Sequence, residues 1–291
     1  MAGLTWDADG IAERRRRGDG EGERGAYRPW LTVRSMASRG TAYRVLGKFG
    51  RTHHFLSARE YKCYLMLAWS NVVTDIREQF PLHELMETAS IAEDMRVKHP
   101  TYRRKEADGS GECAAVMTTD FLVSLADLRG LPHMMALSVK PSTEFAASRR
   151  RVTRLVEKAE IERRYWAARN VPFRFVTDEE MPDAYVQNIK LLLGAQSLDG
   201  LAITAEEVPE ALAYLADQVR AAPTVSLASI CSAADKRLRF TAGLSLALVW
   251  HALGTRQWSV DLMQRLRPDM PIPASLRCAR AAEPTHNRLH A

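Results

Sequence analysis

The sequence predicts an α/β protein in which a mixed sheet flanked by helices precedes a mostly helical C-terminal domain. Three observations predict this. Between residues 52 and 177 the hydrophobic periodicity indicates a helix, a strand, a hairpin, a long helix and another strand, an order typical of helices packed on a sheet. The hairpin consists of two apolar runs within residues 116 to 141, joined by a linker that contains Gly and Pro. Beyond residue 181 the pattern becomes helical.

Composition limits the functional classes. The chain has 291 residues, 46% of them hydrophobic, which is enough for two domains with cores. Its formal net charge of +6 favours an acidic partner, nucleic acid first among them. The four cysteines lie far apart without a CxxC pair, which argues against a zinc site or a disulfide framework and fits a reducing cytoplasm. No apolar run approaches the roughly 20 residues that span a bilayer, so we expect a soluble intracellular protein.

Changes in composition divide the chain into four parts. We expect a flexible basic arm (1–40), an α/β domain (41–180), a helical domain (181–275) and a tail (276–291). The arm contains AERRRRGDGEGERG, which is rich in charge and glycine and is either a solvated tail or a segment that an anion orders. The segment YRPWLTV that follows is more apolar and could dock on the core. The candidate DNA contacts of the arm are Arg14, Arg15, Arg16 and Arg17.

The first helix of the α/β domain is SAREYKCYLMLAWS. Ser57 is followed three residues later by Glu60, the spacing of a capping box, which by itself explains the glutamate. Helical spacing also places Glu60 at the edge of the apolar face, so a second role for its carboxylate stays open.

Charged residues interrupt the hairpin at Asp120 and Lys140. Because strand side chains alternate, Ser138 and Lys140 point to the same side, and Asp120 on the neighbouring strand could meet them. An aspartate among apolar residues is stable only when it is paired or binds a metal. The hairpin therefore predicts either an ion pair between Asp120 and Lys140 or a metal ligand.

A long helix is expected over residues 143–169. Its apolar stripe includes Ala159 and Trp166, and Glu162 falls inside that stripe, where a glutamate is costly without a partner. Glu162 is therefore either a member of a structural ion pair or part of a site. Arginines cover much of the rest of this helix and either keep it soluble or follow a phosphate backbone; the candidates for DNA contact are Arg149, Arg150 and Arg163.

These residue types together point to one reaction. Phosphodiester hydrolysis needs a hard cation on oxygen ligands, which carboxylates supply, and a positive group that positions or deprotonates water, which a lysine supplies. The pattern here is an Asp on one strand, Asp120, and a Ser-x-Lys on the next, Ser138 to Lys140. It is short, and such a pattern occurs by chance in many proteins.

Five separated segments then make the pattern specific. They are GRTHHFLSARE, DIREQFPL, VMTTDFLV, SVKP and EIERRYWAARNVPFRFVTD, and in this order they resemble the TnsA family, the endonuclease subunits of heteromeric cut-and-paste transposases. The arm and YRPWLTV also resemble the N-terminus of that family, so the resemblance runs from about residue 11 to about 178.

The resemblance implies a restriction-endonuclease-like core that uses Mg²⁺, with Mn²⁺ as a possible substitute, to cut DNA at the 5′ ends of a transposon. It implies three partners: transposon-end DNA, a DDE-type transposase subunit that processes the 3′ ends, and an ATP-dependent transposition regulator. It also implies a bacterial, cytoplasmic location, on the nucleoid during transposition. Carried over by motif, the catalytic residues are Glu60, Asp120 and Lys140, with Glu162 in a supporting acidic position.

One position departs from the family pattern. Ser138 stands where the family has Gln, and the metal ligands implied here are Glu60, Asp120 and Ser138. A neutral, short hydroxyl reaches a metal less readily than an amide or a carboxylate does. The alternative function is therefore a weakly active or inactive scaffold that binds DNA and partners and activates the DDE transposase subunit.

Two further features carry open alternatives. His53 and His54 precede the Ser57 cap and either pack a loop or contact phosphate. In the C-terminal domain, two helices with a short turn, followed by Gly254 and a short paired-strand element, predict a winged-helix-like unit. The second of these helices, about residues 241–253, is nearly all apolar, which suits a buried or partner-facing helix better than one that reads bases.

Overall fold

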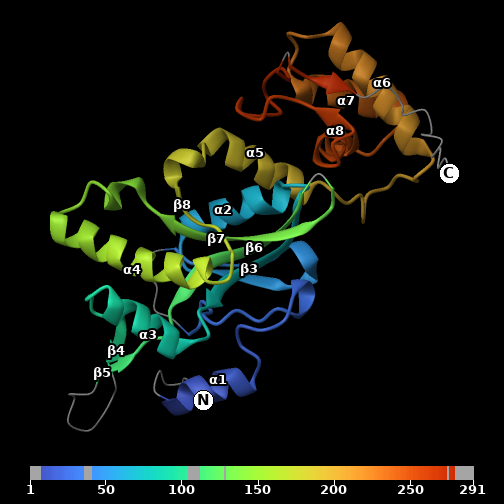
Figure 1. The fold of residues 1–291 in the computed structure, drawn as a ribbon. Coiled ribbons are helices and arrows are strands. Elements are labelled where there is room, and N and C mark those ends of the chain that lie inside the picture. Colours follow the sequence, from blue (N-terminus) through green and yellow to red (C-terminus); the bar gives the residue numbers. More distant parts are fainter. Residues whose placement is uncertain (1–7, 36–40, 104–111, 128, 274, 279–291) are drawn as a thin grey trace, which may run out of the picture. The chain divides into compact units, whose positions relative to one another are not determined.

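The computed structural model describes residues 8–35, 41–103, 112–127, 129–273 and 275–278 (Figure 1). The chain forms two compact units that divide between Met181 and Pro182, one residue from the boundary that the sequence predicts. We call them unit 1 and unit 2. Residues 279–291, most of the predicted tail, and both ends of the predicted arm lie outside the described residues.

Unit 1 contains most of the strands. Its helices are α1 (Ala8–Arg16), α2 (Ala58–Trp69), α3 (Leu85–Asp94) and α4 (Arg149–Ala167), with 3₁₀ turns at Arg24–Ala26, Lys48–Gly50, Ser142–Glu144 and Asp178–Glu180. Its strands are β1 (Tyr43–Leu46), β2 (Thr52–Phe55), β3 (Val73–Pro81), β4 (Thr101–Arg103), β5 (Glu112–Ala114), β6 (Thr118–Ala126), β7 (Pro132–Lys140) and β8 (Phe173–Thr177).

The central sheet of unit 1 has the order β3-β6-β7-β8. Strand β6 is antiparallel to both β3 and β7, whereas β8 runs parallel to β7, so the sheet is mixed, as the sequence predicts. A parallel partner for β7 requires a crossover connection, and α4 supplies it. The predicted α/β class and the predicted hairpin are therefore confirmed.

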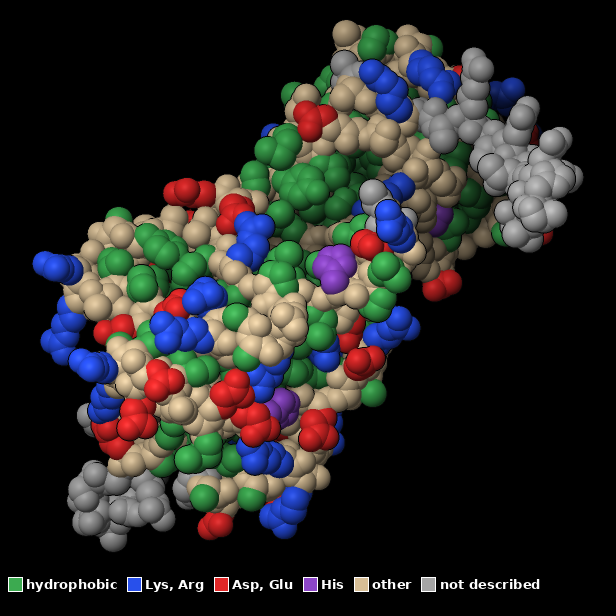
Figure 2. Space-filling view, viewed as in Figure 1, with side chains coloured by type: hydrophobic (Ala, Val, Ile, Leu, Met, Phe, Trp, Pro, Cys, Tyr) green, Lys and Arg blue, Asp and Glu red, His purple; other side chains and the backbone are tan. Residues whose placement is uncertain are grey.

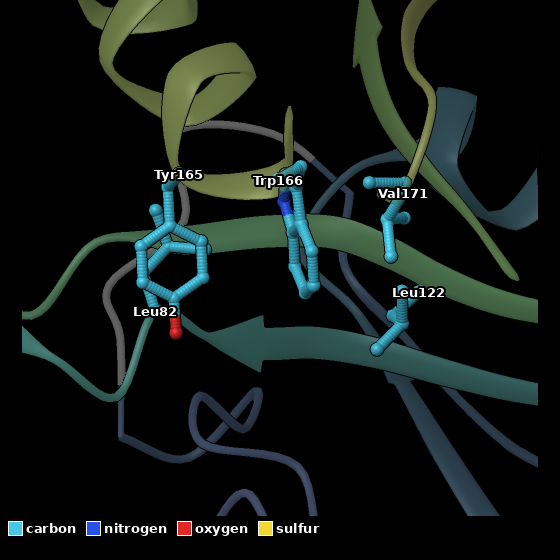
Figure 3. Close-up of a cluster of buried hydrophobic side chains, with 6 residues drawn as sticks. Leu82, Leu122, Tyr165, Trp166 and Val171 are labelled. Atoms are coloured by element: carbon cyan, nitrogen blue, oxygen red, sulfur yellow. The ribbon is translucent and has the colours of Figure 1, made fainter. Parts of the chain in front are cut away.

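The core lies on both faces of this sheet. Figure 3 shows Tyr165 and Trp166 of α4 packed over Leu122 of β6, together with Leu82 and Val171. On the opposite face, the ring of Phe121 lies 6.2 Å from that of Phe55, which in turn lies 4.8 Å from Tyr64 of α2. Alternation along β6 thus fixes one helix on each face.

The N-terminal arm differs from the prediction. Residues 8–35 form α1 and a 3₁₀ turn that pack against the rest of unit 1, and Tyr27 and Trp30 are buried. The flexible arm that the sequence predicts is therefore wrong for these residues. The cause is the apolar segment that follows the charged run: Trp30 and Leu31 form a core cluster with Val116, and this burial stabilises the ordered arm.

Helix α4 begins later than predicted, at Arg149 rather than near residue 143. The backbone N–H of Ser142 donates to the carboxylate of Asp178 at 2.7 Å, which holds the segment after Pro141 in a separate 3₁₀ turn. Ser148 then has non-helical angles, φ −56° and ψ 146°, and marks the start of the long helix.

Unit 2 is mostly helical. It consists of α5 (Asp183–Gly194), α6 (Glu207–Ala221), α7 (Leu227–Leu238), α8 (Leu244–Gly254) and the short paired strands β9 (Trp258–Ser259) and β10 (Arg277–Cys278). The carboxylate of Asp235 in α7 accepts hydrogen bonds from the backbone N–H groups of Gly243 and Ser245, which caps the start of α8. Helix α8 is buried along most of its length, as its apolar sequence indicates. In the described part of the chain, every helix is too short or too polar to cross a bilayer.

Candidate active site

Asp120 is the centre of the candidate site. Its Oδ2 accepts hydrogen bonds from the backbone N–H of Val139 at 2.7 Å, from Lys140 Nζ at 3.1 Å and from Ser138 Oγ at 3.3 Å. The ion pair between Asp120 and Lys140, one of the two alternatives that the hairpin predicts, is therefore present. All three donors contact Oδ2, and within the described residues Oδ1 accepts no hydrogen bond.

Lys140 carries a positive charge in this environment. Burial alone would lower the pKa of its ammonium, but the carboxylates of Asp120 and Glu162 outweigh burial, and the pKa is raised above its usual value. At neutral pH this side chain is therefore a cation that donates hydrogen bonds and does not act as a base.

Glu60 lies at the start of α2, where one half of the predicted capping box forms: Ser57 Oγ accepts from the backbone N–H of Glu60, but the Glu60 carboxylate bonds to the backbone N–H of Leu56 and not to that of Ser57. Ser57 Oγ donates to Glu60 Oε1 at 2.8 Å, and Oε2 accepts from the backbone N–H of Leu56 at 2.8 Å and from Gln79 Nε2 at 3.0 Å. Burial, followed by the charge of Asp120, raises the pKa of Glu60 to about 7. The capping role does not exclude a second role, because the carboxylates of Glu60 and Asp120 lie close enough to repel each other.

Glu162 is buried in the apolar stripe of α4, as predicted. Its Oε1 accepts a hydrogen bond from Thr119 Oγ1 at 2.7 Å, and Thr119 in turn accepts from Trp166 Nε1 at 2.7 Å. Burial raises the pKa of Glu162 to about 8, although Thr119 and the charge of Lys140 oppose the rise. The carboxyl group is therefore mostly protonated at pH 7.

A cavity of about 290 Å³ lies beside Lys140 and Glu162. Its polar lining includes Thr118, Ser138, Lys140, Lys158 and Glu162. Lys158 is a second cation on this cavity, which the sequence did not single out; burial and the positive charges of Arg154 and Lys140 lower its pKa. The cavity thus has two positive groups, Lys140 and Lys158, beside the carboxyl group of Glu162, an arrangement that suits an anionic substrate.

The donor set fits a hard divalent cation. Among the described residues there is no group of three or more His, Cys, Asp or Glu side chains that could hold a metal ion. Mg²⁺ keeps several waters and commonly takes only one or two protein carboxylates, so Glu60 and Asp120 are enough. Two facts support the fit: Asp120 Oδ1 accepts no hydrogen bond from the part of the chain that the structure describes, and the carboxylates repel each other, which a cation between them would relieve. The hydroxyl of Ser138, the third ligand that the resemblance implies, donates to Asp120 here.

Two predicted DNA contacts are wrong. His53 is fully buried, and its ring nitrogens contact Glu78 Oε2 and the carbonyl oxygen of Lys48, both at 3.0 Å. Arg14 is 3% exposed and donates to the carbonyl oxygen of Trp30 at 3.1 Å. Neither side chain can reach a phosphate from this position, because each is buried and bonded to groups inside unit 1.

The other predicted DNA contacts have mixed surroundings. Arg15 donates to the carbonyl oxygen of His83, and Arg16 forms a salt bridge with Glu13. Arg17 lies 3.8 Å from Asp19, and Arg163 pairs with Glu160 at 2.6 Å. His54 Nδ1 accepts a hydrogen bond from the backbone N–H of Val33.

Arg149 and Arg150 are exposed at the start of α4. With Arg154 they line an open cavity of about 670 Å³. Figure 2 shows Lys and Arg side chains gathered at the end of unit 1 where α4 begins in Figure 1, with acidic side chains among the basic ones elsewhere on this face. The beginning of α4 is therefore the most basic part of this face of unit 1.

Gln79 is a site residue that the sequence alone does not predict. It belongs to the DIREQF segment, and its amide contacts the carboxylate of Glu60 directly. The resemblance of this segment to a family motif is the one signal in the sequence that points to Gln79. No local pattern of residues predicts that a glutamine on a strand contacts a carboxylate at a helix N-terminus.

The sequence matches known proteins in both units. The family model "TnsA-like endonuclease N terminal" matches residues 70–178, and the model "TnsA endonuclease C terminal" matches residues 180–262. The transposon Tn7 transposition protein TnsA of Escherichia coli is 38% identical over 188 residues, which are 64% of this chain and 63% of that protein. The match thus spans less than two thirds of the relative's length. Asp120, Ser138, Lys140 and Glu162 fall inside the first family match, and Glu60 lies before it.

Proposed function

Since the chain belongs to the TnsA-like endonuclease family, we propose that it is the DNA-cutting subunit of a cut-and-paste transposase and hydrolyses phosphodiester bonds at the transposon's 5′ ends. The mixed sheet flanked by helices agrees with a restriction-endonuclease-like fold. The observation that carries the proposal is the set of donors on Asp120 Oδ2, which places Lys140 against this carboxylate while Glu60 lies close enough to repel it.

Glu60 and Asp120 would hold a divalent cation, Mg²⁺ or Mn²⁺, through their carboxylate oxygens. When bound, such a cation polarises the scissile phosphate and lowers the pKa of a water molecule. Ser138 and Val139 hold the Asp120 carboxylate in one orientation, so its Oδ1 stays available for the cation. Ser138 therefore supports a ligand, and a direct bond from its own hydroxyl to the metal is not needed.

Lys140 would contact the phosphate that is cut. Its ammonium is charged at neutral pH, so it stabilises the negative charge that develops on the phosphate oxygens. Lys158, on the same cavity, would bind a neighbouring phosphate of the same strand. Glu162, held neutral by burial, adds no further negative charge where the DNA must approach.

The basic start of α4 would continue this contact with DNA. Arg149 and Arg150 are exposed there, and phosphate contacts of this kind give affinity and position without reading sequence. The further partners that we propose are a DDE-type transposase subunit and an ATP-dependent regulator. The family resemblance assigns regulator binding to unit 2, and the burial of its helix α8 argues against base reading by that helix.

The test is cleavage of transposon-end DNA by the full chain with its partner subunits and Mg²⁺ or Mn²⁺. Asp120→Ala should reduce 5′-end nicking by more than about a hundredfold, because the ligand and the anchor of Lys140 are both lost. Joining of the 3′ ends should continue. Asp127→Ala, an exposed aspartate in the turn of the same hairpin, is the matched control and should nick as the wild type does.

The same experiment separates the alternative function. A chain that serves only as a scaffold for DNA and partners would support 3′ joining equally well as wild type and as Asp120→Ala, and neither protein would nick the 5′ ends. The observation that favours this alternative is Ser138, whose side chain is almost fully buried and bonded to Asp120 and so offers no ligand of its own.

A further inference from the structure

Gln79 has an unusual backbone for a strand residue. Its φ is +50°, in the left-handed region that residues other than glycine rarely adopt, and the residue is 2% exposed. It stands opposite Asp120 in the register, between the pairs Glu78–Phe121 and Phe80–Thr119. Such a conformation persists only where the surroundings hold it, and it is often found at functional sites.

The side chain of Gln79 points into the candidate site. Its Nε2 donates to Glu60 Oε2 at 3.0 Å, and its Oε1 accepts from Thr118 Oγ1 at 3.4 Å. The two contacts use both ends of the amide, so the group has one orientation in this network. The NH₂ end is therefore directed at a carboxylate that we propose as a metal ligand.

The N-terminal arm holds the backbone of β3 at this point. The backbone N–H of Trp30 donates to the carbonyl oxygen of Gln79 at 3.3 Å, and Tyr27 Oη donates to the carbonyl oxygen of Glu78 at 3.0 Å. Tyr27 and Trp30 are both almost fully buried, so these contacts are shielded from water. The arm thus donates hydrogen bonds to the carbonyl groups of Gln79 and of the residue before it.

The side chain of Glu78 fixes the strand from another direction. Its Oε1 accepts from Arg51 Nη1 at 2.8 Å and from the backbone N–H of His54 at 3.1 Å. Residue 78 is therefore anchored through both its side chain and its backbone, and the left-handed turn at the next residue sets where the Gln79 amide points.

From these contacts we infer that Gln79 is a positioning residue that orients the Glu60 carboxylate for metal binding, and that Tyr27 and Trp30 of the arm hold Gln79 in place. The inference rests on the proposed function for the identity of the ligand, a divalent cation. The arm would then act on the active site through β3, in addition to any contact it makes with DNA. A hydrogen-bond donor behind a metal ligand is commonly worth about ten- to a hundredfold in metal affinity.

The test is calorimetric titration of the full chain with Mn²⁺ alone. Gln79→Met keeps the length of the side chain and removes the amide, and we expect its Kd for Mn²⁺ to rise at least about tenfold. Gln196→Met is the matched control, because the Gln196 amide donates to the carbonyl oxygen of Gly254 in unit 2 and its loss should leave the Kd unchanged. Asp120→Ala should bind no Mn²⁺ at the candidate site.

A second variant tests the arm. Tyr27→Phe removes only the hydroxyl that bonds to Glu78, so the fold is kept, and we expect the Mn²⁺ Kd to rise about two- to fivefold. In the nicking assay, Gln79→Met should need a higher Mn²⁺ concentration for half-maximal rate while its rate at saturating Mn²⁺ stays close to that of the wild type. If Gln79 were merely structural, Gln79→Met would instead lower the urea midpoint of unfolding and leave the Mn²⁺ concentration for half-maximal rate unchanged.

The outcomes separate the two proposals. If wild type binds Mn²⁺, Asp120→Ala does not, and both Gln79→Met and Tyr27→Phe bind as tightly as wild type, the inference is overturned while the proposed metal site stands. If wild type itself binds no Mn²⁺, the metal site proposed for this chain is overturned, and the role of Gln79 with it.

Discussion

Glu162→Gln gives a quantitative test of the electrostatics of the site. The pKa of Glu162 is raised by burial from 4.5 to about 8, so at neutral pH the folded protein holds a proton that the unfolded chain releases. The contribution of Glu162 to the free energy of unfolding is therefore fully present below pH 4.5 and falls as the pH rises toward 8. The glutamine side chain of this variant would resemble the neutral acid in shape, because its amide keeps an oxygen for Thr119 and a donor in place of the carboxyl O–H.

The expected magnitude follows from the two pKa values. With about 1.4 kcal/mol for each pH unit, the wild type loses on the order of 3 kcal/mol of unfolding free energy between pH 4 and pH 7 through this group. The variant has no such group. Without metal, Glu162→Gln should therefore match the wild type at pH 4 and be more stable by roughly 3 kcal/mol at pH 7.

Urea unfolding of the metal-free full chain, followed by circular dichroism at pH 4, 5, 6 and 7, measures this difference. The two units can unfold separately, so the transition to follow is the one that Glu162→Gln shifts, and the other transition serves as an internal reference. Parallel curves for wild type and variant across this pH range would refute the reasoning, because they would mean that Glu162 titrates alike in the folded and unfolded chains.

Two further predictions concern unit 1. Burial alone would raise the pKa of Glu78, but Arg51 and His53 hold it at about 2; Glu78→Gln leaves Arg51 buried without a counter-charge and should cost about 3 to 5 kcal/mol in urea unfolding. The pKa of Glu160 is also about 2, because Arg163 donates hydrogen bonds to its carboxylate, but here the partners are exposed. Glu160→Gln should therefore cost less than about 1 kcal/mol, and a loss equal to that of Glu78→Gln would contradict this expectation. Gly20→Ala should loosen the arm, since φ is +88° and the new Cβ would meet Pro81 Cγ at 2.3 Å. Gly18→Ala has φ +72°, and its new Cβ would meet only Glu21 Oε2, at 4.0 Å, so it should show just the backbone cost of about 1 to 2 kcal/mol. Trypsin cleavage in the arm compares the two variants, and equal cleavage would contradict the contact with Pro81.

Much of the site could be predicted from local patterns. Strand alternation and the hairpin were enough to bring Asp120 to Lys140, and the capping spacing fixed Glu60 at the start of α2. The stripe of α4 placed Glu162 in the core. The approach of Glu60 to Asp120 depends on how α2 packs on the sheet, and only the family resemblance suggested it.

The remaining features depend on tertiary contacts that local patterns do not contain. The arm was predicted to be flexible from its charge density, but the burial of Trp30 orders it and takes Arg14 out of the surface. His53 is polar by type, yet the buried carboxylate of Glu78 gives it a partner inside the fold. No sequence signal predicts the positive φ of Gln79, because contacts from a distant segment impose it.

The most direct test of the account is a crystal structure of the full chain soaked in Mn²⁺, with anomalous scattering to locate the ion. We expect one anomalous peak bound by carboxylate oxygens of both Glu60 and Asp120, with the Lys140 ammonium beside it and not bonded to it. A peak elsewhere, or none at saturating Mn²⁺, would contradict the claim that these two carboxylates form the metal site.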